Sequence, residues 1–385
     1  MRLKRVLLAC AVCAVVSFVL AAGPAPAGDL PRARPESLGM SGGRLARVGE
    51  VLAGSVARGE APGYVTLVAR RGKIVHLEGH GRRDPGTDEP MKVDALFGLA
   101  SMTKPVTAVA AQILYEEGRL AMHEPLSLHV PALARLKVVD DAGATQPLER
   151  EITLHDLLTH TSGFDDGLGR LERYAHPTLA DHMAEFVERP LAFQPGKRWR
   201  YGDSFDFLGY LVQVVSGQPL DAFLRERIFE PLGMVDTAYW PGPEDESRVA
   251  VLLQDGAPDR QRASRLPPGA AARRSYVSGT TGLFSTAGDY WRFAQMLLNG
   301  GVRDGERVLG SRTVGWIHTN HIGDLALPEW AGPGFRFGFG VAFLVDPARH
   351  TAPAGPGSYG WGGALGTDFW VDPENELVAV FMVQA

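Results

Sequence analysis

Cysteine is almost absent from this chain. Its 385 residues include two cysteines, Cys10 and Cys13, and both lie in an apolar run over residues 6–22. Three basic residues precede this run and a small-x-small site ending at Ala27 follows it, which is the pattern of a secretory signal peptide. Cleavage after Ala27 leaves a chain without cysteine, and this excludes disulfides, thiolate metal sites and a cysteine nucleophile.

Long hydrophobic runs are also scarce. The run over residues 6–22 is short for a transmembrane span, and no later stretch approaches the necessary length. Cys10 has hardly any apolar sequence before it, which is too little for a lipoprotein processing site. We therefore expect removal of residues 1–27 and export to the periplasm or the exterior, with no stable membrane anchor.

Basic residues are fewer than acidic residues in this chain. The expected signal peptide carries three of the 39 basic residues and none of the 44 acidic ones, so the remaining chain has a formal charge of 36 − 44 = −8. A mildly acidic surface with scattered arginines argues against nucleic acid as a partner. The chain also lacks an H-E-x-x-H sequence, and His155 with His160 is too little for a zinc site. We expect no metal and no cofactor.

Strand patterns lie at both ends of the chain, and helical patterns lie between them. Apolar residues recur at helical spacing over residues 41–58 and 287–299 and in several segments between 120 and 275. Strands are expected over residues 64–70, 73–81, 337–345, 360–371 and 376–383. The pattern predicts one α/β (α+β) domain over residues 28–385, with one sheet from about 35–110 and 280–385 and a mostly helical insertion over about 120–275.

A serine and a lysine stand three residues apart in "FGLASMTKPVTAVAAQILYEEGRL", residues 97–120. A spacing of three places Ser101 and Lys104 on one helix face. Pro105 is tolerated only in a first helical turn, so the helix is predicted to begin near Ser101, at the positive end of its dipole. Lys104 can accept the serine proton only while neutral, which desolvation and positive potential both favour. The pattern S-x-x-K is also common by chance, and a surface serine beside a solvated lysine is the alternative.

Three further segments carry candidate site residues. Tyr201 and Asp203 lie in a turn before a helix in "WRYGDSFDFLGYLV", where a core tyrosine is the structural alternative. Trp361, in "YGWGGALGTDFW", precedes glycines that allow a strand to approach a ligand closely, with a bulge or a barrel corner as the alternative. His160, in "LLTHTSGF", is expected to be structural rather than catalytic.

In this order the segments resemble the serine β-lactamase and penicillin-binding-protein superfamily. The likeness is greatest to its class C-like branch, which includes family VIII carboxylesterases, D-aminopeptidases and related acyltransferases. It extends from about residue 35 to the last residue and includes "DALFGLASMTKPVTA", "LLTHTSGF", "FLRERIFEPLGM" and "GLFSTAGDYWRFAQMLLNGG". The resemblance implies a β-lactamase/transpeptidase-like fold, in which helices flank an antiparallel sheet built from both chain ends.

The same resemblance implies a serine hydrolase that acts through an acyl-enzyme on a small-molecule acyl substrate. Ser101 would be the acylated nucleophile and Lys104 its general-base partner. Tyr201 would supply the hydroxyl or phenolate that relays protons to and from the leaving group.

The third motif of the superfamily corresponds to Trp361, Gly362 and Gly363. The next residue, Ala364, would lend a backbone N–H to the oxyanion hole together with that of the nucleophile. Penicillin-recognising members have lysine where this chain has Trp361, so an apolar wall replaces an ammonium that helps to hold the substrate carboxylate. Asp203 stands where the β-lactamases have asparagine, and its carboxylate would repel an anionic substrate.

These departures favour a carboxylesterase that acts on small or medium acyl esters. A β-lactamase or a D-amino-acid peptidase (DD-carboxypeptidase) is the alternative among enzymes. A sensor or binding protein that is acylated and does not turn over is the alternative of another class. If Asp203 lies close to Lys104 it favours the charged amine, which leaves open whether Lys104 or Tyr201 is the resting base.

A second serine fits a different nucleophile pattern. Residues 39–43, with Ser41 at their centre, match the G-x-S-x-G elbow of α/β-hydrolases. That elbow requires a strand before the serine and a helix after it. Only a proline-bearing segment precedes Ser41, so we expect Ser41 to cap the helix over residues 41–58 instead.

The last predicted strand, residues 377–383, is apolar at every position, so both of its faces are expected to be buried. One face would pack towards the helices around Ser101. The other would pack under the helix over residues 41–58, where resembling proteins also dock a C-terminal helix. The sequence has no residues after Ala385 for such a helix, so we expect either a fragment or a partly bare outer sheet face.

Overall fold

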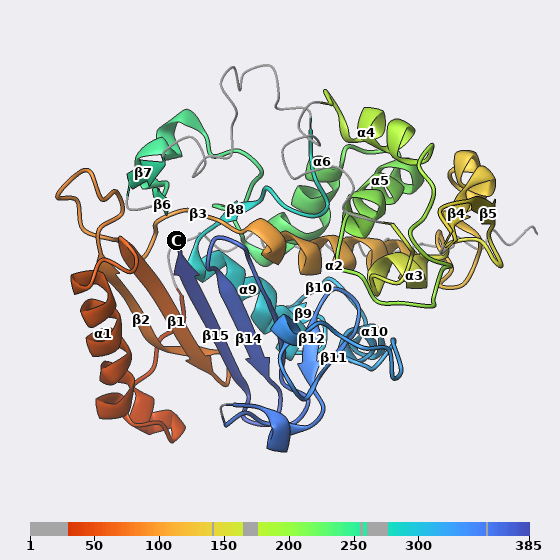
Figure 1. Ribbon diagram of the computed structural model, residues 1–385. Coiled ribbons are helices and arrows are strands. Elements are labelled where there is room, and N and C mark those ends of the chain that lie inside the picture. Colours follow the sequence, from red (N-terminus) through yellow and green to blue (C-terminus); the bar gives the residue numbers. More distant parts are fainter. Residues whose placement is uncertain (1–29, 141, 165–175, 255–256, 260–275, 352) are drawn as a thin grey trace, which may run out of the picture.

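The centre of the fold is a sheet whose strands come from both ends of the described chain (Figure 1). The computed structural model describes residues 30–140, 142–164, 176–254, 257–259, 276–351 and 353–385, so the expected signal peptide lies outside it. The sheet has seven antiparallel strands in the order β11-β12-β13-β14-β15-β1-β2. Their bounds are β1 (Gly63–Arg70), β2 (Lys73–Gly81), β11 (Phe335–Phe337), β12 (Ala342–Leu344), β13 (Tyr359–Gly362), β14 (Asp368–Asp372) and β15 (Leu377–Val383). The prediction of one antiparallel sheet from both chain ends is confirmed.

The first and last strands of the described chain lie side by side in this sheet, next to its edge strand β2. Strand β1 pairs with β15, with Thr66 opposite Phe381, and with β2 through a tight hairpin. Arg71 and Gly72 form the hairpin turn, with φ of 51° and 71°, and two positive φ values match the twist of an antiparallel pair. The N-terminal hairpin and the C-terminal strand therefore form one continuous surface.

A helix covers each face of this part of the sheet (Figure 1). Helix α9 (Ala287–Leu298) packs against β15, β14 and β1 on the inner face. Helix α1 (Gly42–Ala57) packs against β2 and β1 on the outer face. Ser41 caps α1, because its Oγ accepts a hydrogen bond from the backbone N–H of Arg44 at 3.3 Å. The capping prediction is confirmed, and Ser41 follows no strand as a nucleophile elbow would.

The remaining helices lie beside the sheet, with α2 at their centre (Figure 1). Every residue of α2 from Thr103 to Leu114 is buried, and the helix packs against α5 and α6. The helices are α2 (Thr103–Glu116), α3 (Leu154–Leu158), α4 (Leu179–Phe186), α5 (Ser204–Ser216), α6 (Leu220–Leu224), α7 (Glu230–Leu232) and α10 (Ser311–Ile317). The described chain also contains four short strand pairs: β3 (Phe97–Gly98) with β8 (Phe284–Ser285), β4 (Lys137–Val139) with β5 (Thr145–Pro147), β6 (Leu252–Gln254) with β7 (Ala257–Asp259), and β9 (Val302–Arg303) with β10 (Glu306–Arg307).

Two predicted strands are hairpins in the structure. The segment over residues 337–345 spans the turn between β11 and β12, and the segment over residues 360–371 spans the turn between β13 and β14. Each turn contains a glycine with positive φ, Gly340 at 78° and Gly366 at 87°. Glycine adopts a positive φ at little cost, so the chain turns at these two positions and each strand ends there. The apolar pattern alone suggested that the strands continue.

Strand β15 is buried along one face, whereas on its other face only Val383 is buried. Val378, Val380 and Met382 are buried against the inner layer, whereas alternate residues on the outer face, such as Ala379 and Phe381, are partly exposed. The prediction that both faces are buried is therefore wrong for the outer face. Helix α1 covers only part of that face, near the contact between the rings of Tyr64 and Phe381, whose centroids lie 5.5 Å apart.

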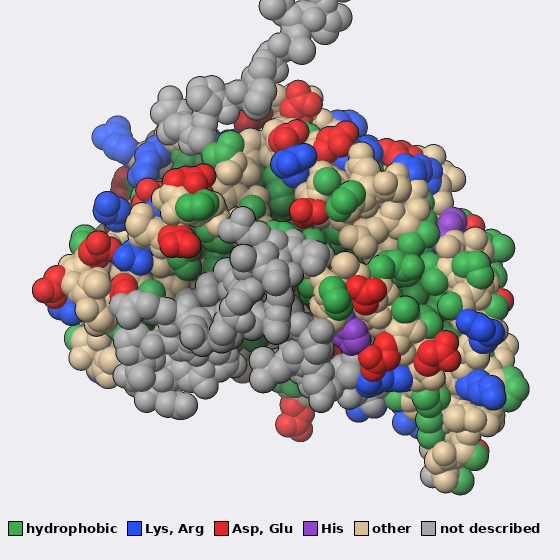
Figure 2. Space-filling view, turned by 90° about the horizontal axis from the view of Figure 1, so that it is seen from above, with side chains coloured by type: hydrophobic (Ala, Val, Ile, Leu, Met, Phe, Trp, Pro, Cys, Tyr) green, Lys and Arg blue, Asp and Glu red, His purple; other side chains and the backbone are tan. Residues whose placement is uncertain are grey.

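The described surface carries charges of both signs. On the face shown in Figure 2, Asp and Glu side chains lie among Lys and Arg rather than in separate patches. No helix within the described ranges is long and apolar enough to cross a bilayer.

Candidate active site

The backbone at Ser101 lies in a strained turn. Ser101 is in the 3-10 turn Ala100–Met102, which leads directly into α2 and places the helix start close to its predicted position. Ala100 adopts a φ of 48°, a left-handed conformation that costs about 1–3 kcal/mol in a residue other than glycine. The hydroxyl of Tyr290 on α9 donates a hydrogen bond to the carbonyl oxygen of Met102 at 2.9 Å. The inner helix thus holds the turn in place.

The structure brings Ser101 and Lys104 together. Lys104 Nζ lies 3.2 Å from Ser101 Oγ and 3.3 Å from the carbonyl oxygen of Thr280. The amine also lies 4.5 Å from the centroid of the Tyr201 ring. Lys104 is 1% exposed, whereas Ser101 is partly exposed. A substrate can therefore reach the serine, while the lysine exchanges protons only through the groups that it touches.

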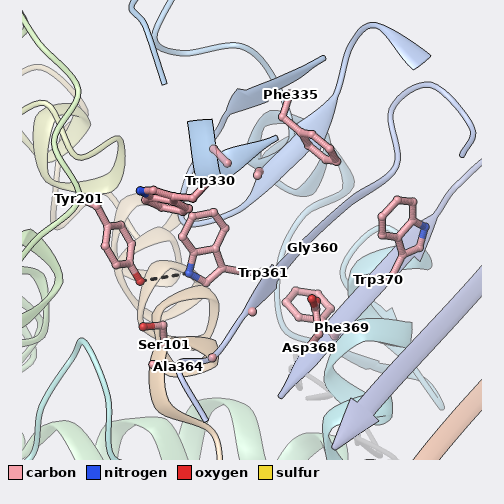
Figure 3. Close-up of a pocket in the computed structure, with 14 residues that line it drawn as sticks. Ser101, Tyr201, Trp330, Phe335, Gly360, Trp361, Ala364, Asp368, Phe369 and Trp370 are labelled. Atoms are coloured by element: carbon pink, nitrogen blue, oxygen red, sulfur yellow. Dashed lines mark hydrogen bonds between the residues drawn. The ribbon is translucent and has the colours of Figure 1, made fainter. Parts of the chain in front are cut away.

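Tyr201 links this pair to an aromatic wall. Its hydroxyl accepts a hydrogen bond from Trp361 Nε1 at 3.3 Å, the interaction drawn in Figure 3. His160 is fully buried against Tyr201, with ring centroids 4.7 Å apart, and neither of its ring nitrogens has a hydrogen-bond partner among the described residues. Burial, together with the nearby Lys104, holds the pKa of His160 well below its ordinary value. His160 is therefore a neutral packing partner of Tyr201, which agrees with the expected structural role.

A buried carboxyl group that the sequence analysis missed positions the lysine. Asp206, in the first turn of α5, accepts hydrogen bonds from the backbone N–H of Thr280 at 3.0 Å and from Ser278 Oγ at 2.5 Å. Tyr276 Oη donates a third hydrogen bond to the carboxyl group at 3.4 Å. These hydrogen bonds hold the segment around Thr280 so that its carbonyl oxygen accepts a hydrogen bond from Lys104 Nζ. Its spacing of three from Asp203 was a signal in the sequence, but its partners lie 70 to 74 residues away.

The glycine-rich turn after β13 lies against the segment that carries the serine. A Cβ on Gly363 would lie 2.3 Å from the carbonyl oxygen of Leu99 and equally close to Thr367 Oγ1, so only glycine fits there. Thr367 Oγ1 itself donates to the same carbonyl at 3.1 Å. The backbone N–H of Ala364 has no acceptor in the described part of the chain. This close approach places Ala364 beside Ser101, as Figure 3 shows.

A cavity of about 640 Å³ opens at this place. Six of the predicted site residues line it: Ser101, Tyr201, Trp361, Gly362, Gly363 and Ala364. Lys104 lies outside the lining, behind Ser101 and Tyr201. Asp203 is 1% exposed at the residue before α5, so the structure does not bring it into the cavity wall.

Two side chains of the cavity wall were not predicted. Trp330 is 60% exposed at the cavity edge, with its ring centroid 5.5 Å from that of Tyr201 and 6.0 Å from that of Trp361. Asp368, the first residue of β14, is exposed in the cavity wall, and partial desolvation of its carboxyl group raises its pKa to about 6. Asp368 lies in the quoted glycine-rich segment, whereas nothing in the sequence connected Trp330 with the site.

Histidines gather elsewhere without forming a metal site. The His155 ring lies 5.3 Å from that of His123 and 5.5 Å from that of His321. Burial lowers the pKa of His155 to about 4. Over the described ranges, no group of three or more His, Asp or Glu side chains is placed to hold a metal ion.

Comparison with known proteins identifies the family. The family model described as Beta-lactamase matches residues 48–385. Protein Rv1367c of Mycobacterium tuberculosis is 36% identical over 344 residues, which cover 84% of this chain and 85% of that protein. Esterase EstB of Burkholderia gladioli is 32% identical over 341 residues, which cover 80% of this chain and 82% of that protein. The solved structure of EstCE1, a hydrolase with promiscuous acyltransferase activity, matches with a TM-score of 0.76 at 26% identity and covers 91% of this chain and 94% of its own. The fold is therefore β-lactamase/transpeptidase-like, and the chain belongs to the β-lactamase family within the serine hydrolases.

Proposed function

We propose that this protein is a carboxylesterase that forms an acyl-enzyme on Ser101. One observation carries the proposal: Ser101 Oγ lies 3.2 Å from the buried amine of Lys104, in a cavity whose wall has Trp361 at the position of the family's lysine. The names of two similar proteins, an esterase and a hydrolase with acyltransferase activity, support this class of reaction.

The geometry suits a two-step acyl transfer. Ser101 Oγ attacks the ester carbonyl while its proton passes to the pair formed by Lys104 and Tyr201, and the carbonyl oxygen becomes an oxyanion that faces the backbone N–H groups of Ser101 and Ala364. The ester bond then breaks, and the alcohol leaves with the proton that the pair returns. Water attacks the acyl-serine in the second step, and the acid leaves as Ser101 regains its proton.

The cavity wall favours neutral esters over β-lactams. Among the described residues that line it there is no Lys, Arg or His, so nothing there pairs with the carboxylate of a penicillin or a cephalosporin. Trp361 instead presents an indole that is 9% exposed and donates its N–H to Tyr201. β-Lactam hydrolysis, D-amino-acid peptidase activity and a non-turnover acylated sensor are the alternatives that the experiment must separate.

The test is a substrate panel on purified protein comprising residues 28–385. We expect p-nitrophenyl acetate and butyrate to be hydrolysed with a higher kcat/KM than a chromogenic cephalosporin or a D-alanyl peptide, and Ser101→Ala to lose this activity. A cephalosporin or peptide efficiency equal to that of the best ester contradicts the esterase assignment. One burst of p-nitrophenol without steady turnover would identify a sensor instead.

We further propose that the protein is exported and that its mature form begins at residue 28. This rests on the sequence alone, from the basic start, the apolar run and the small-residue site that ends at Ala27. Expression in a bacterium, followed by cell fractionation and N-terminal mass determination, tests it. Full-length protein retained in the cytoplasm would contradict it.

A further inference from the structure

The cavity at Ser101 combines aromatic walls with a single carboxylate. Of the described residues that line it, Asp368 alone carries a carboxyl group, and none is basic. Five lining residues other than Tyr201 are aromatic: Trp330, Phe335, Trp361, Phe369 and Trp370. Aromatic faces and one acidic side chain together form the surroundings that bind organic cations, because both the ring quadrupole and the carboxylate attract positive charge.

Asp368 has no other evident function in the fold. It begins β14, where it pairs with Gly362 across the hairpin, and no basic residue of the described chain forms an ion pair with it or offsets the rise in its pKa. The carboxyl group is exposed and has no counter-charge in the described part of the chain. A bound cation would supply that counter-charge.

The path from the serine to this carboxylate is open. A Cβ added to Gly362 would lie only 3.4 Å from Asp368 Oδ2. Because glycine has no side chain, this space between Asp368 and Ala364 is left free. In Figure 3, Ser101 and Asp368 lie at two separate places in the cavity, with Ala364 near the serine. A substrate acylating Ser101 can therefore extend over Gly362 towards Asp368.

We propose that the natural substrate is an ester whose far end carries a protonated or quaternary ammonium group, bound by Asp368 and by Trp370, which lies on the same face of β14. This inference rests on the esterase activity proposed above and specifies its substrate class. The carbonyl is neutral and lies at Ser101, while the positive charge lies across Gly362 from it. The formal charge of −8 expected for the exported chain also favours the approach of a cation.

The experiment compares isosteric esters that differ only in charge. Butyrylcholine and 3,3-dimethylbutyl butyrate have the same shape, and longer ω-trimethylammonium-alkyl butyrates move the charge farther from the carbonyl. We expect at least one cationic ester of the series to exceed its neutral isostere in kcat/KM by roughly tenfold or more. Asp368→Asn should abolish that preference, so that the two esters of a pair are hydrolysed with similar kcat/KM. Asp372→Asn, the same change on the same strand but outside the cavity lining, should retain it.

A binding measurement separates this inference from the esterase proposal. Choline and 3,3-dimethylbutanol are titrated against tryptophan fluorescence in wild-type protein and in Asp368→Asn. If no ester is hydrolysed yet choline binds more tightly than its neutral analogue and loses that advantage in Asp368→Asn, the esterase proposal fails and the cation site stands. Equal efficiencies for every ester pair, or a cationic preference that persists in Asp368→Asn, overturns the inference.

Discussion

The loop that orients Lys104 depends on Asp206, and this dependence can be measured. Asp206 is fully buried and accepts three hydrogen bonds, two of them on Oδ1 from Ser278 and from the backbone of Thr280. Replacement by alanine leaves the Ser278 hydroxyl without this acceptor, at about 1–3 kcal/mol. The Thr280 N–H keeps Ser278 Oγ at 3.1 Å, and Tyr276 Oη keeps His182 Nδ1 at 2.6 Å. We expect Asp206→Ala to lose about 1–3 kcal/mol of unfolding free energy. A shift of the loop by about 1 Å should lower kcat about 100-fold.

The conservative variant Asp206→Asn separates an effect on the position of Lys104 from an effect on folding. Asp206→Asn retains the Oδ1 acceptor, so its kcat should stay within about tenfold of wild type, since a single altered hydrogen bond is worth about 0.5–1.5 kcal/mol. The assay is p-nitrophenyl butyrate hydrolysis with kcat and KM separated, beside urea unfolding; kcat should fall and KM should change little. If Asp206→Ala does not fold, Ser278→Ala removes one of the three donors and should show a smaller loss of kcat. Folded Asp206→Ala with wild-type kcat, or Asp206→Asn as inactive as alanine, would show that Asp206 does not position Lys104.

Three further outcomes follow from the site and its surroundings. Trp361→Phe keeps the apolar wall but removes the N–H donated to Tyr201, so kcat should fall about 2- to 10-fold in ester assays, and an unchanged kcat would contradict that role. Gly363→Ala should lower the melting temperature and abolish activity because its Cβ would lie 2.3 Å from a backbone oxygen, whereas Gly362→Ala, with 3.4 Å of clearance, should fold normally. Burial depresses the pKa of His160, so the unfolded chain binds a proton there that the folded chain does not as the pH falls below 6.5; unfolding free energy should decrease between pH 7 and 5, and less so in His160→Gln.

The sequence predicted the parts of this protein that local patterns determine. Helical and strand periodicities placed the sheet at both chain ends, and a spacing of three was enough to predict that Ser101 and Lys104 share one turn. The apolar pattern predicted single strands over residues 337–345 and 360–371, where the structure has hairpins. An apolar run does not show where a glycine with positive φ reverses the chain.

The rest of the site depends on contacts between segments distant in sequence. Asp203 was expected near the substrate, yet the packing of α5 buries it, while Asp206 on the next turn meets its partners through the tertiary fold. Trp330 and Asp368 face the cavity because the sheet and its connecting loops meet there. The spacing of residues within one segment does not predict contacts between segments that are distant in sequence.

The most direct test of the account is the covalent attachment of the acyl group. Protein comprising residues 28–385 is mixed with p-nitrophenyl butyrate, quenched in acid within the first turnover, digested and examined by mass spectrometry. We predict a butyryl adduct on the peptide that contains Ser101, absent in Ser101→Ala and undiminished in Ser41→Ala. A protein that hydrolyses the ester fully in Ser101→Ala, or that carries the acyl group on Ser41, would contradict the account.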